Sequence, residues 1–214
     1  MQFFIDTGDL KEIEEASKWG CIDGVTTNPT LVAKTGMSNS DLIHKICALV
    51  DGPVSGEVIA VEHKAMVEEG VGLAQIHKNV VVKLPMTKDG MMACKDLTAK
   101  GIKTNVTLIF TANQALLAAK NGATYVSPFV GRLDDVGQTG TDLLSEIRQI
   151  FDNYGFKTKI LAASIRGPEH MKIAALAGAD VATLPFKVLE QLYQHPLTKI
   201  GLDTFLADHA KAKK

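Results

Sequence analysis

The feature that most constrains the fold is a regular alternation of short apolar segments with longer segments of helical period. The apolar, β-branched segments predict strands at residues 3–6, 24–27, 54–59, 80–84, 103–109, 125–129, 159–163 and 181–184. The helical spacing of apolar residues predicts helices at 9–19, 40–50, 64–77, 89–100, 112–121, 141–154 and 168–177, with further helix towards the end. Strands that alternate with helices form a parallel sheet with right-handed crossovers.

The number of these units favours a closed barrel. Eight strand–helix units are enough to close a ring, and a length of 214 residues suits one such domain. We therefore expect an α/β protein: a single (β/α)8 TIM barrel spanning residues 1–214, with an extra C-terminal helix. The main alternative is an open, doubly wound sheet, which usually has fewer strands and a glycine-rich turn after its first strand. Here that turn reads Asp6-Thr7-Gly8-Asp9 and lacks the G-x-G-x-x-G pattern.

The composition argues against several kinds of binding partner. Basic residues number 23 and acidic residues 24, and this balance argues against a nucleic-acid partner. The 3 cysteines are far apart, and the 6 histidines include no H-E-x-x-H pair, so we expect no metal site. No apolar run approaches the roughly 18 residues that cross a bilayer, and the N-terminus does not read as a signal peptide. We expect a cytoplasmic protein with no membrane partner.

Polar and ionisable residues gather at or just beyond the ends of the predicted strands, where a barrel of this type places its active site. Buried parallel strands normally carry apolar side chains, so this departure indicates a functional site. In chain order the residues are Asp6, Thr26, Asn28, Glu57, Lys83, Asn105, Thr107, Ser127, Arg132, Ser164 and Arg166.

The most informative of these residues is Lys83, which lies in Val80-Val81-Val82-Lys83-Leu84-Pro85. Its neighbours predict a buried strand, and an ammonium group is costly to bury. Burial and nearby positive charge favour the neutral amine, which can attack a carbonyl and form an iminium, a good electron sink. The alternative is a lysine at the mouth of the strand that reaches solvent or pairs with Glu57 or Asp6.

Two carboxylates, Asp6 and Glu57, are the candidate acid–base pair. Aldol cleavage needs a group that takes a hydroxyl proton and further proton transfers at the carbinolamine. The two groups can equally be counter-ions of Lys83. Side chains that can hydrogen-bond sugar hydroxyls are Asn28, Asn105 and Thr107, although Asn28 before Pro29 is also an ordinary turn residue.

Two arginines follow successive strands and suggest a phosphate clamp. Arg132 lies beyond the sixth strand, and Ser164 and Arg166 lie beyond the seventh. Guanidinium groups bind phosphate oxygens with paired N–H donors. The alternative is that the arginines form surface ion pairs with Asp134 or Glu169.

Six motifs, each at a strand end and in the same order, resemble the transaldolase family, and in particular its short subfamily, which also contains fructose-6-phosphate aldolases. The resemblance covers essentially the whole chain. It implies sugar-phosphate substrates, no metal or organic cofactor, and a homo-oligomer, pentamer or decamer, in which the C-terminal helix crosses between subunits. The motifs are Asp6-Thr7, Gly24-Val25-Thr26-Thr27-Asn28-Pro29, Val82-Lys83-Leu84-Pro85-Met86-Thr87, Asn105-Val106-Thr107-Leu108-Ile109-Phe110, Ser127-Pro128-Phe129-Val130-Gly131-Arg132 and Ala162-Ala163-Ser164-Ile165-Arg166.

The resemblance also implies a role for each residue at the strand ends. Lys83 would form the Schiff base, and Asp6 would handle the proton of the C4 hydroxyl. Glu57 would shuttle protons through a water that Thr107 helps to hold. The residues implied around the dihydroxyacetone unit are Thr26, Asn28, Asn105, Ser127 and Phe129. The residues implied to bind the phosphate are Arg132, Ser164 and Arg166.

Three positions bear on the branch of the family. The chain resembles transaldolases at Glu57, Asn105 and Phe129, where the aldolase branch typically has glutamine, a small residue and tyrosine. We therefore predict a transaldolase, a transferase of the pentose phosphate pathway. It would convert sedoheptulose 7-phosphate and glyceraldehyde 3-phosphate to erythrose 4-phosphate and fructose 6-phosphate. The alternatives are a fructose-6-phosphate aldolase, which is a lyase, and an inactive barrel that only binds sugar phosphates.

Overall fold

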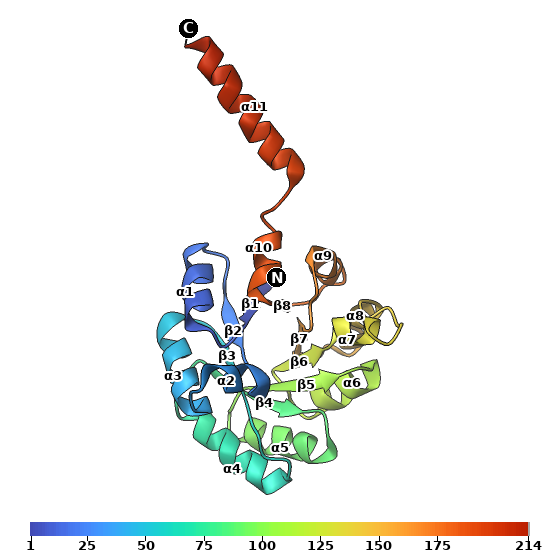
Figure 1. Ribbon diagram of the computed structural model, residues 1–214. Coiled ribbons are helices and arrows are strands. Elements are labelled where there is room, and N and C mark those ends of the chain that lie inside the picture. Colours follow the sequence, from blue (N-terminus) through green and yellow to red (C-terminus); the bar gives the residue numbers. More distant parts are fainter. Residues whose placement is uncertain (214) are drawn as a thin grey trace.

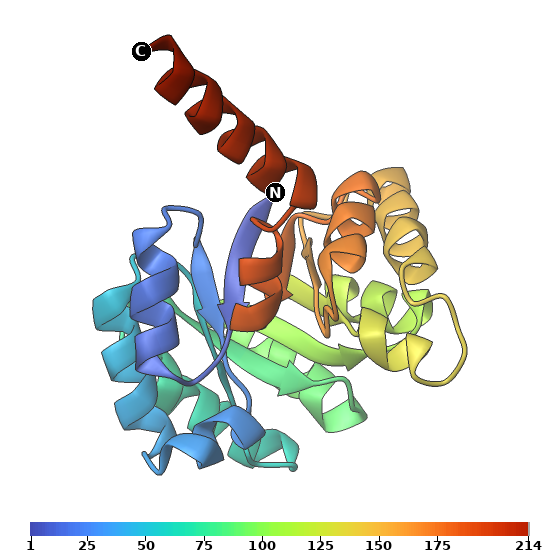
Figure 2. The same cartoon turned by 45° about the horizontal axis from the view of Figure 1, so that its top comes forward.

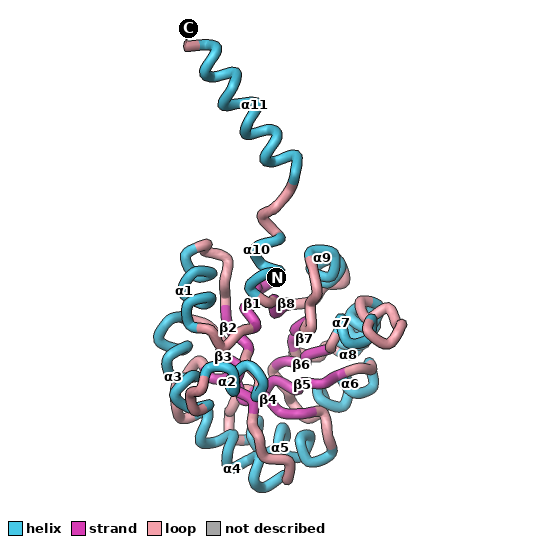
Figure 3. The backbone as a smooth tube through the Cα atoms, viewed as in Figure 1, coloured by secondary structure: helices cyan, strands magenta, loops and turns pink. Residues whose placement is uncertain are grey.

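The structure, a computed structural model, describes residues 1–213 and forms a closed barrel of eight parallel strands. The strands neighbour one another in chain order, and β1 pairs with β8 to close the ring. Figure 1 shows the helices around this ring, and Figure 3 shows the strands in magenta inside the cyan helices. The expected (β/α)8 barrel with a further C-terminal helix is confirmed. The last residue of the predicted domain, Lys214, lies outside the described residues.

All eight predicted strands are present, and their ends differ from the predicted ends by at most two residues. The strands are β1 (Gln2–Asp6), β2 (Gly24–Thr26), β3 (Val54–Glu57), β4 (Val80–Pro85), β5 (Thr104–Ile109), β6 (Tyr125–Pro128), β7 (Lys159–Ala162) and β8 (Val181–Leu184). The helices are α1 (Leu10–Lys18), α2 (Pro29–Thr35), α3 (Asn39–Leu49), α4 (His63–Ala74), α5 (Lys88–Ala99), α6 (Ala112–Lys120), α7 (Val130–Asp134), α8 (Asp142–Tyr154), α9 (Pro168–Leu176), α10 (Phe186–Gln191) and α11 (Pro196–Ala212).

Two short helices, α2 and α7, were not predicted. α2 begins after Asn28, whose side-chain oxygen accepts the backbone N–H of Leu31 at 3.0 Å, with Pro29 in the first turn. Asn28 is therefore a helix N-cap as well as a residue at the barrel mouth. α7 has five residues, too few to show a helical period. Its first N–H groups donate to backbone oxygens at the end of β7, so tertiary contacts help to define it.

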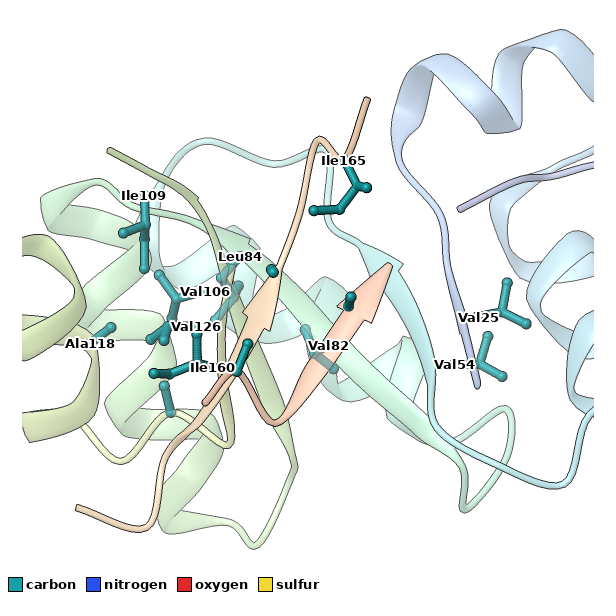
Figure 4. Close-up of a cluster of buried hydrophobic side chains, with 14 of the residues drawn as sticks. Val25, Val54, Val82, Leu84, Val106, Ile109, Ala118, Val126, Ile160 and Ile165 are labelled. Atoms are coloured by element: carbon teal, nitrogen blue, oxygen red, sulfur yellow. The ribbon is translucent and has the colours of Figure 1, made fainter. Parts of the chain in front are cut away.

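Side chains alternate along each strand and so separate two layers. Outward-facing residues pack against the helices, and Figure 4 shows Val82, Leu84 and Val106 among them. A second cluster fills the barrel interior and contains Phe4, Val81, Tyr125, Leu161 and Val181. Two positions further along four of these strands, and so also facing inward, are the polar residues Asp6, Lys83, Ser127 and Thr183. The change from apolar to polar residues along the inward face places a polar layer at the C-terminal ends of the strands.

The C-terminal helix α11 projects away from the barrel, as Figures 1 and 2 show. It contains no buried residue over its 17 residues. The preceding segment is anchored by aromatic contacts, because the ring of Trp19 lies 5.2 Å from Phe186 and 5.6 Å from Tyr193. Across residues 1–213, none of the helices combines the length and the apolar character that spanning a membrane requires.

Candidate active site

The polar inward layer opens into two adjoining cavities at the C-terminal mouth of the barrel. One has a volume of about 180 Å³ and contains Asp6, and the other has a volume of about 430 Å³ and contains Glu57. Both are lined by Lys83, which therefore lies where they meet. Of the residues predicted for the site, all except Asn105 line one cavity or both. The structure thus brings residues from seven strand ends to one place.

The amine of Lys83 is held by two acceptors. Its side chain is almost fully buried, and Nζ lies 2.9 Å from Oε2 of Glu57. Nζ also donates a hydrogen bond to the backbone oxygen of Thr27 at 3.0 Å. Glu57 and Lys83 are directly opposite each other in the β3–β4 register, which explains the pairing. Glu57 is therefore placed to take a proton from the ammonium group and to return it.

The Asp6 carboxyl belongs to a separate hydrogen-bonded chain. The hydroxyl of Thr26 donates to Oδ1 of Asp6 at 2.7 Å and lies 2.6 Å from the hydroxyl of Thr183. Because Thr26 has one hydroxyl proton and gives it to Asp6, Thr183 is the donor to Thr26. Burial raises the pKa of Asp6, and the charge of Lys83 and the Thr26 hydrogen bond offset this only in part. A carboxylate with a raised pKa is a stronger base than an ordinary aspartate.

Thr107 lies at an irregularity in β5. The register with β6 shifts between Val106 and Ile109, and Leu108 has a φ of 61°, which is unusual for a residue with a side chain. The Thr107 hydroxyl is buried without a hydrogen-bond partner within residues 1–213, and it lines the cavity that contains Glu57. Buried hydroxyls normally have a partner, so this hydroxyl is available to bind an oxygen of a ligand or water.

Asn105 lies below the cavities and supports the residue above it. It is fully buried, and its Oδ1 accepts a hydrogen bond from the Ser127 hydroxyl at 2.7 Å. Its Nδ2 donates to the hydroxyl of Ser55 at 3.2 Å. Ser127 lines the cavity, and Asn105 fixes its orientation.

The arginines lie on α7 and on the loop between β7 and α9. The guanidinium of Arg132 stacks 4.8 Å from the centre of the Phe129 ring. Nη2 of Arg166 lies 2.6 Å from Oδ2 of Asp135. Both arginines line the same cavity, together with Ser164. The cluster has the donors needed to bind a phosphate group.

The predicted alternative partners of these arginines, Asp134 and Glu169, are wrong. Asp134 lies 2.9 Å from His170, and Glu169 lies 2.7 Å from Lys172. The arginine partner that does form, Asp135, is next to Asp134 in the chain. Sequence proximity alone did not distinguish these neighbouring carboxylates.

Two hydroxyl residues of the network, Thr183 and Ser55, were not selected from the sequence. Thr183 lines the cavity with Asp6, and Ser55 accepts the hydrogen bond of Asn105. Each is a small polar residue on a short, buried strand, at a position of inward-facing parity. Parity counted along β8 from the inward-facing Val181 finds Thr183, whereas Ser55 is found from the register that places it opposite the inward-facing Val81.

Comparison with known proteins identifies the family. A family model described as transaldolase/fructose-6-phosphate aldolase matches residues 3–214. A protein of Geotalea daltonii named probable transaldolase is 59% identical over 214 residues, the full length of both chains. Another of that name, from Caldicellulosiruptor saccharolyticus, is 60% identical over 215 residues, covering 100% of this chain and 99% of its own. A third, from Hyphomonas neptunium, is 58% identical and covers 99% of this chain and 98% of its own. The chain belongs to the transaldolase/fructose-6-phosphate aldolase family.

Proposed function

We propose that this chain is a transaldolase, one catalytic domain that transfers a dihydroxyacetone unit between ketose and aldose phosphates through a Schiff base on Lys83. The observation that carries the proposal is the position of Lys83 between two carboxylates with different surroundings. Glu57 contacts the amine directly, whereas Asp6 is held by Thr26 in the adjoining cavity. The full-length relatives named probable transaldolase support the same activity.

The first half-reaction begins at the amine. Glu57 accepts a proton from the ammonium group of Lys83, and the neutral amine attacks the C2 ketone of fructose 6-phosphate or sedoheptulose 7-phosphate. Return of a proton to the carbinolamine oxygen releases water and leaves an iminium. The unpartnered hydroxyl of Thr107, in the same cavity as Glu57, supports a role in holding the water that carries these protons.

Cleavage takes place on the side of Asp6. Asp6 takes the proton of the C4 hydroxyl, the C3–C4 bond breaks, and its electron pair moves to the iminium to give an enamine on Lys83. The aldose phosphate leaves. An acceptor, erythrose 4-phosphate or glyceraldehyde 3-phosphate, then adds by the reverse steps, and hydrolysis frees the new ketose. The kinetics of such a double displacement are ping-pong.

The remaining residues bind the sugar. The phosphate group occupies the side of the cavity that carries Arg132, Ser164 and Arg166, where two guanidinium groups supply charged donors. The hydroxyls near the dihydroxyacetone unit face Asn28, Thr26 and Ser127, which line the same cavity as the Phe129 ring. Asn105 acts through Ser127.

We further infer a homo-oligomer, a pentamer or decamer, that works in the cytoplasm in the pentose phosphate pathway. The support for assembly is α11, which projects from the barrel with five large apolar side chains between 56% and 74% exposed. These residues are Leu197, Ile200, Leu202, Phe205 and Leu206. A helix with such side chains is stabilised when another surface covers them.

The test is release of glyceraldehyde 3-phosphate from fructose 6-phosphate, measured with and without erythrose 4-phosphate. We expect release that depends on the acceptor, with sedoheptulose 7-phosphate appearing in equal amount. Sustained release without acceptor would instead make the enzyme an aldolase. No release in either case, from folded protein, would leave a barrel that only binds sugar phosphates.

A further inference from the structure

Behind the phosphate-binding residues lies a pair of side chains that lines neither cavity. The pair is formed by His170 on α9 and Asp134, the last residue of α7. Nε2 of His170 lies 2.9 Å from Oδ2 of Asp134. Nδ1 of the same ring accepts the backbone N–H of Arg166 at 3.2 Å. The imidazole thus connects α7 to the loop that carries Arg166.

The hydrogen bonds indicate which nitrogen of a neutral His170 imidazole carries the proton. Because Nδ1 is an acceptor, the proton of a neutral imidazole is on Nε2 and is donated to the Asp134 carboxylate. The other oxygen of that carboxylate, Oδ1, accepts the N–H of Gly140 at 2.8 Å. The side chains of His170 and Asp134 are 20% and 36% exposed, so the pair is partly shielded from solvent. One carboxylate therefore joins α7, the loop after it and α9, and the His170 ring extends this connection to the β7–α9 loop.

The β7–α9 loop contains a residue in an unfavourable backbone conformation, which contacts with neighbouring elements stabilise. Ser164 has a φ of 59°, in the left-handed region that residues with a side chain occupy at a cost. At the start of α7, the N–H groups of Val130 and Gly131 donate to the backbone oxygens of Ala163 and Ser164 at 3.0 and 3.1 Å. The His170–Asp134 pair makes the second attachment, at the other end of α7. The two attachments set the loop against the helix that carries Arg132.

We propose that Asp134 and His170 are positioning residues for the phosphate pocket. They hold the backbone of Arg166 against α7, so that Arg132, Ser164 and Arg166 meet one phosphate group. Neither residue lines the two cavities. The inference rests on the proposed function of those three residues in binding phosphate. It assigns to the pair an effect on phosphate affinity and none on the chemistry at Lys83.

The experiment compares His170→Phe and Asp134→Asn with the unchanged enzyme at a temperature well below unfolding. We expect the KM for fructose 6-phosphate to rise roughly 10-fold, as for loss of a shielded hydrogen bond to a charged group. The kcat should stay within about twofold because the reacting groups are untouched. Trapping of the Lys83 Schiff base by borohydride with dihydroxyacetone, which has no phosphate, should also be unchanged.

Two further variants separate positioning from folding. His63→Phe is the matched control, because His63 forms a similar pair with Asp96 at 2.8 Å and lines neither cavity. Its KM should equal that of the unchanged enzyme. In His170→Asn the side-chain oxygen can replace Nδ1 as acceptor for the Arg166 N–H. This variant should recover part of the lost affinity and remains informative if His170→Phe does not fold.

The outcomes are distinct. An unchanged KM in folded His170 and Asp134 variants overturns the proposal, as does a fall in Schiff-base trapping equal to the loss with fructose 6-phosphate. Arg166→Ala is the reference for the pocket itself. If it raises the KM while the His170 variants do not, the phosphate site stands and the positioning role is wrong. If Arg166→Ala leaves the KM unchanged, the phosphate site is wrong, and the positioning role falls with it.

Discussion

At the residue scale, the two carboxylates beside Lys83 differ in what they contact. Glu57 shares an ion pair with the amine, and Asp6 receives a hydrogen bond from Thr26. The difference follows from position, since Glu57 is opposite Lys83 on the neighbouring strand, whereas Asp6 lies on β1 across the barrel interior. This separation suits Glu57 to proton transfers at nitrogen and Asp6 to proton transfer at a substrate hydroxyl.

Replacement of the amine should abolish the reaction. In Lys83→Ala we expect the rate to fall by roughly 10³-fold or more, because the proposed reaction forms its iminium on this amine. Lys83→Arg keeps a positive charge opposite Glu57 but cannot lose its proton, so it should be equally inactive. Intact-mass measurement after borohydride treatment with dihydroxyacetone checks both variants. A mass increase in either one would place the Schiff base on another lysine.

The raised pKa of Asp6 makes a prediction about stability. A carboxyl whose folded-state pKa lies above its unfolded value favours folding when protonated, and this contribution is lost as the pH rises through the folded pKa. The asparagine in Asp6→Asn resembles the protonated acid at every pH. We therefore expect the variant to be inactive yet more stable than the unchanged protein at neutral pH.

Thermal unfolding as a function of pH measures this difference. The gain in Tm for Asp6→Asn should vanish well below the ordinary aspartate pKa of about 3.9 and grow towards neutral pH. Asp208→Asn, at an exposed ion pair on α11, is the control and should show little dependence on pH. A variant that is less stable than the unchanged protein at neutral pH would mean that the Asp6 charge supports the fold.

At the element scale, α7 and the β7–α9 loop approach each other so closely that only glycine fits between them. A Cβ at Gly131 would overlap the backbone oxygen of Ser164 and lie 2.6 Å from Nε of Arg166. We expect Gly131→Ala to cost about 1–3 kcal/mol of stability through overpacking. It should also raise the KM for fructose 6-phosphate, because the helix and the loop carry the two arginines.

Gly167→Ala is the matched control for this change. Gly167 belongs to the same loop, its φ of −179° is extended backbone, and a Cβ there would meet no atom within 4 Å. Its Tm and KM should therefore equal those of the unchanged enzyme. Chemical denaturation measures the stability of the two variants, and steady-state kinetics measures their KM for fructose 6-phosphate. Equal behaviour of the two glycine variants would contradict the close approach at Gly131.

At the scale of the whole molecule, the proposed assembly through α11 can be tested separately from the reaction at Lys83. Leu202, Phe205 and Leu206 follow the i, i+3, i+4 spacing of one helix face. Replacing all three with aspartate should convert the proposed oligomer to a smaller species, which light scattering after size exclusion would detect. All the site residues lie in one barrel, so the smaller species should still form the Schiff base. Lys211→Glu, about half a turn around the helix from Leu202, should leave the assembly unchanged.

A particle mass equal to one chain before any substitution would contradict the oligomer proposal outright. So would an unchanged oligomer in the triple variant, because the exposed apolar face would then serve no contact between chains. Neither result would alter the assignment of Lys83, since borohydride trapping reports on it independently.

The local pattern determined most of the architecture. Strand and helix periods and the polar residues at strand ends are properties of short segments, so the eight strands and the candidate site residues could be predicted without tertiary information. The features that the sequence did not predict depend on contacts between distant segments or on elements too short to show a period. α7 is too short for a period, and its first N–H groups bond to the end of β7. The sequence suggested an ordinary turn residue at Asn28, and in the structure its side chain also caps the N-terminus of α2.

Local signals were therefore enough to predict the barrel and to single out Lys83 as the candidate amine, because strand–helix alternation and a lysine in a valine-rich strand are both visible in short segments. The hydrogen-bond and ion-pair partners of the polar side chains, in contrast, depend on the tertiary structure. Closure of the barrel brings Thr183 next to Thr26, which is 157 residues away in the chain. In the folded protein Arg166 pairs with Asp135, whereas His170 pairs with Asp134. Adjacent carboxylates have the same chemistry in the sequence. Their directions differ only once a helix and a loop are packed together, because hydrogen bonds require distances and angles that a sequence does not contain.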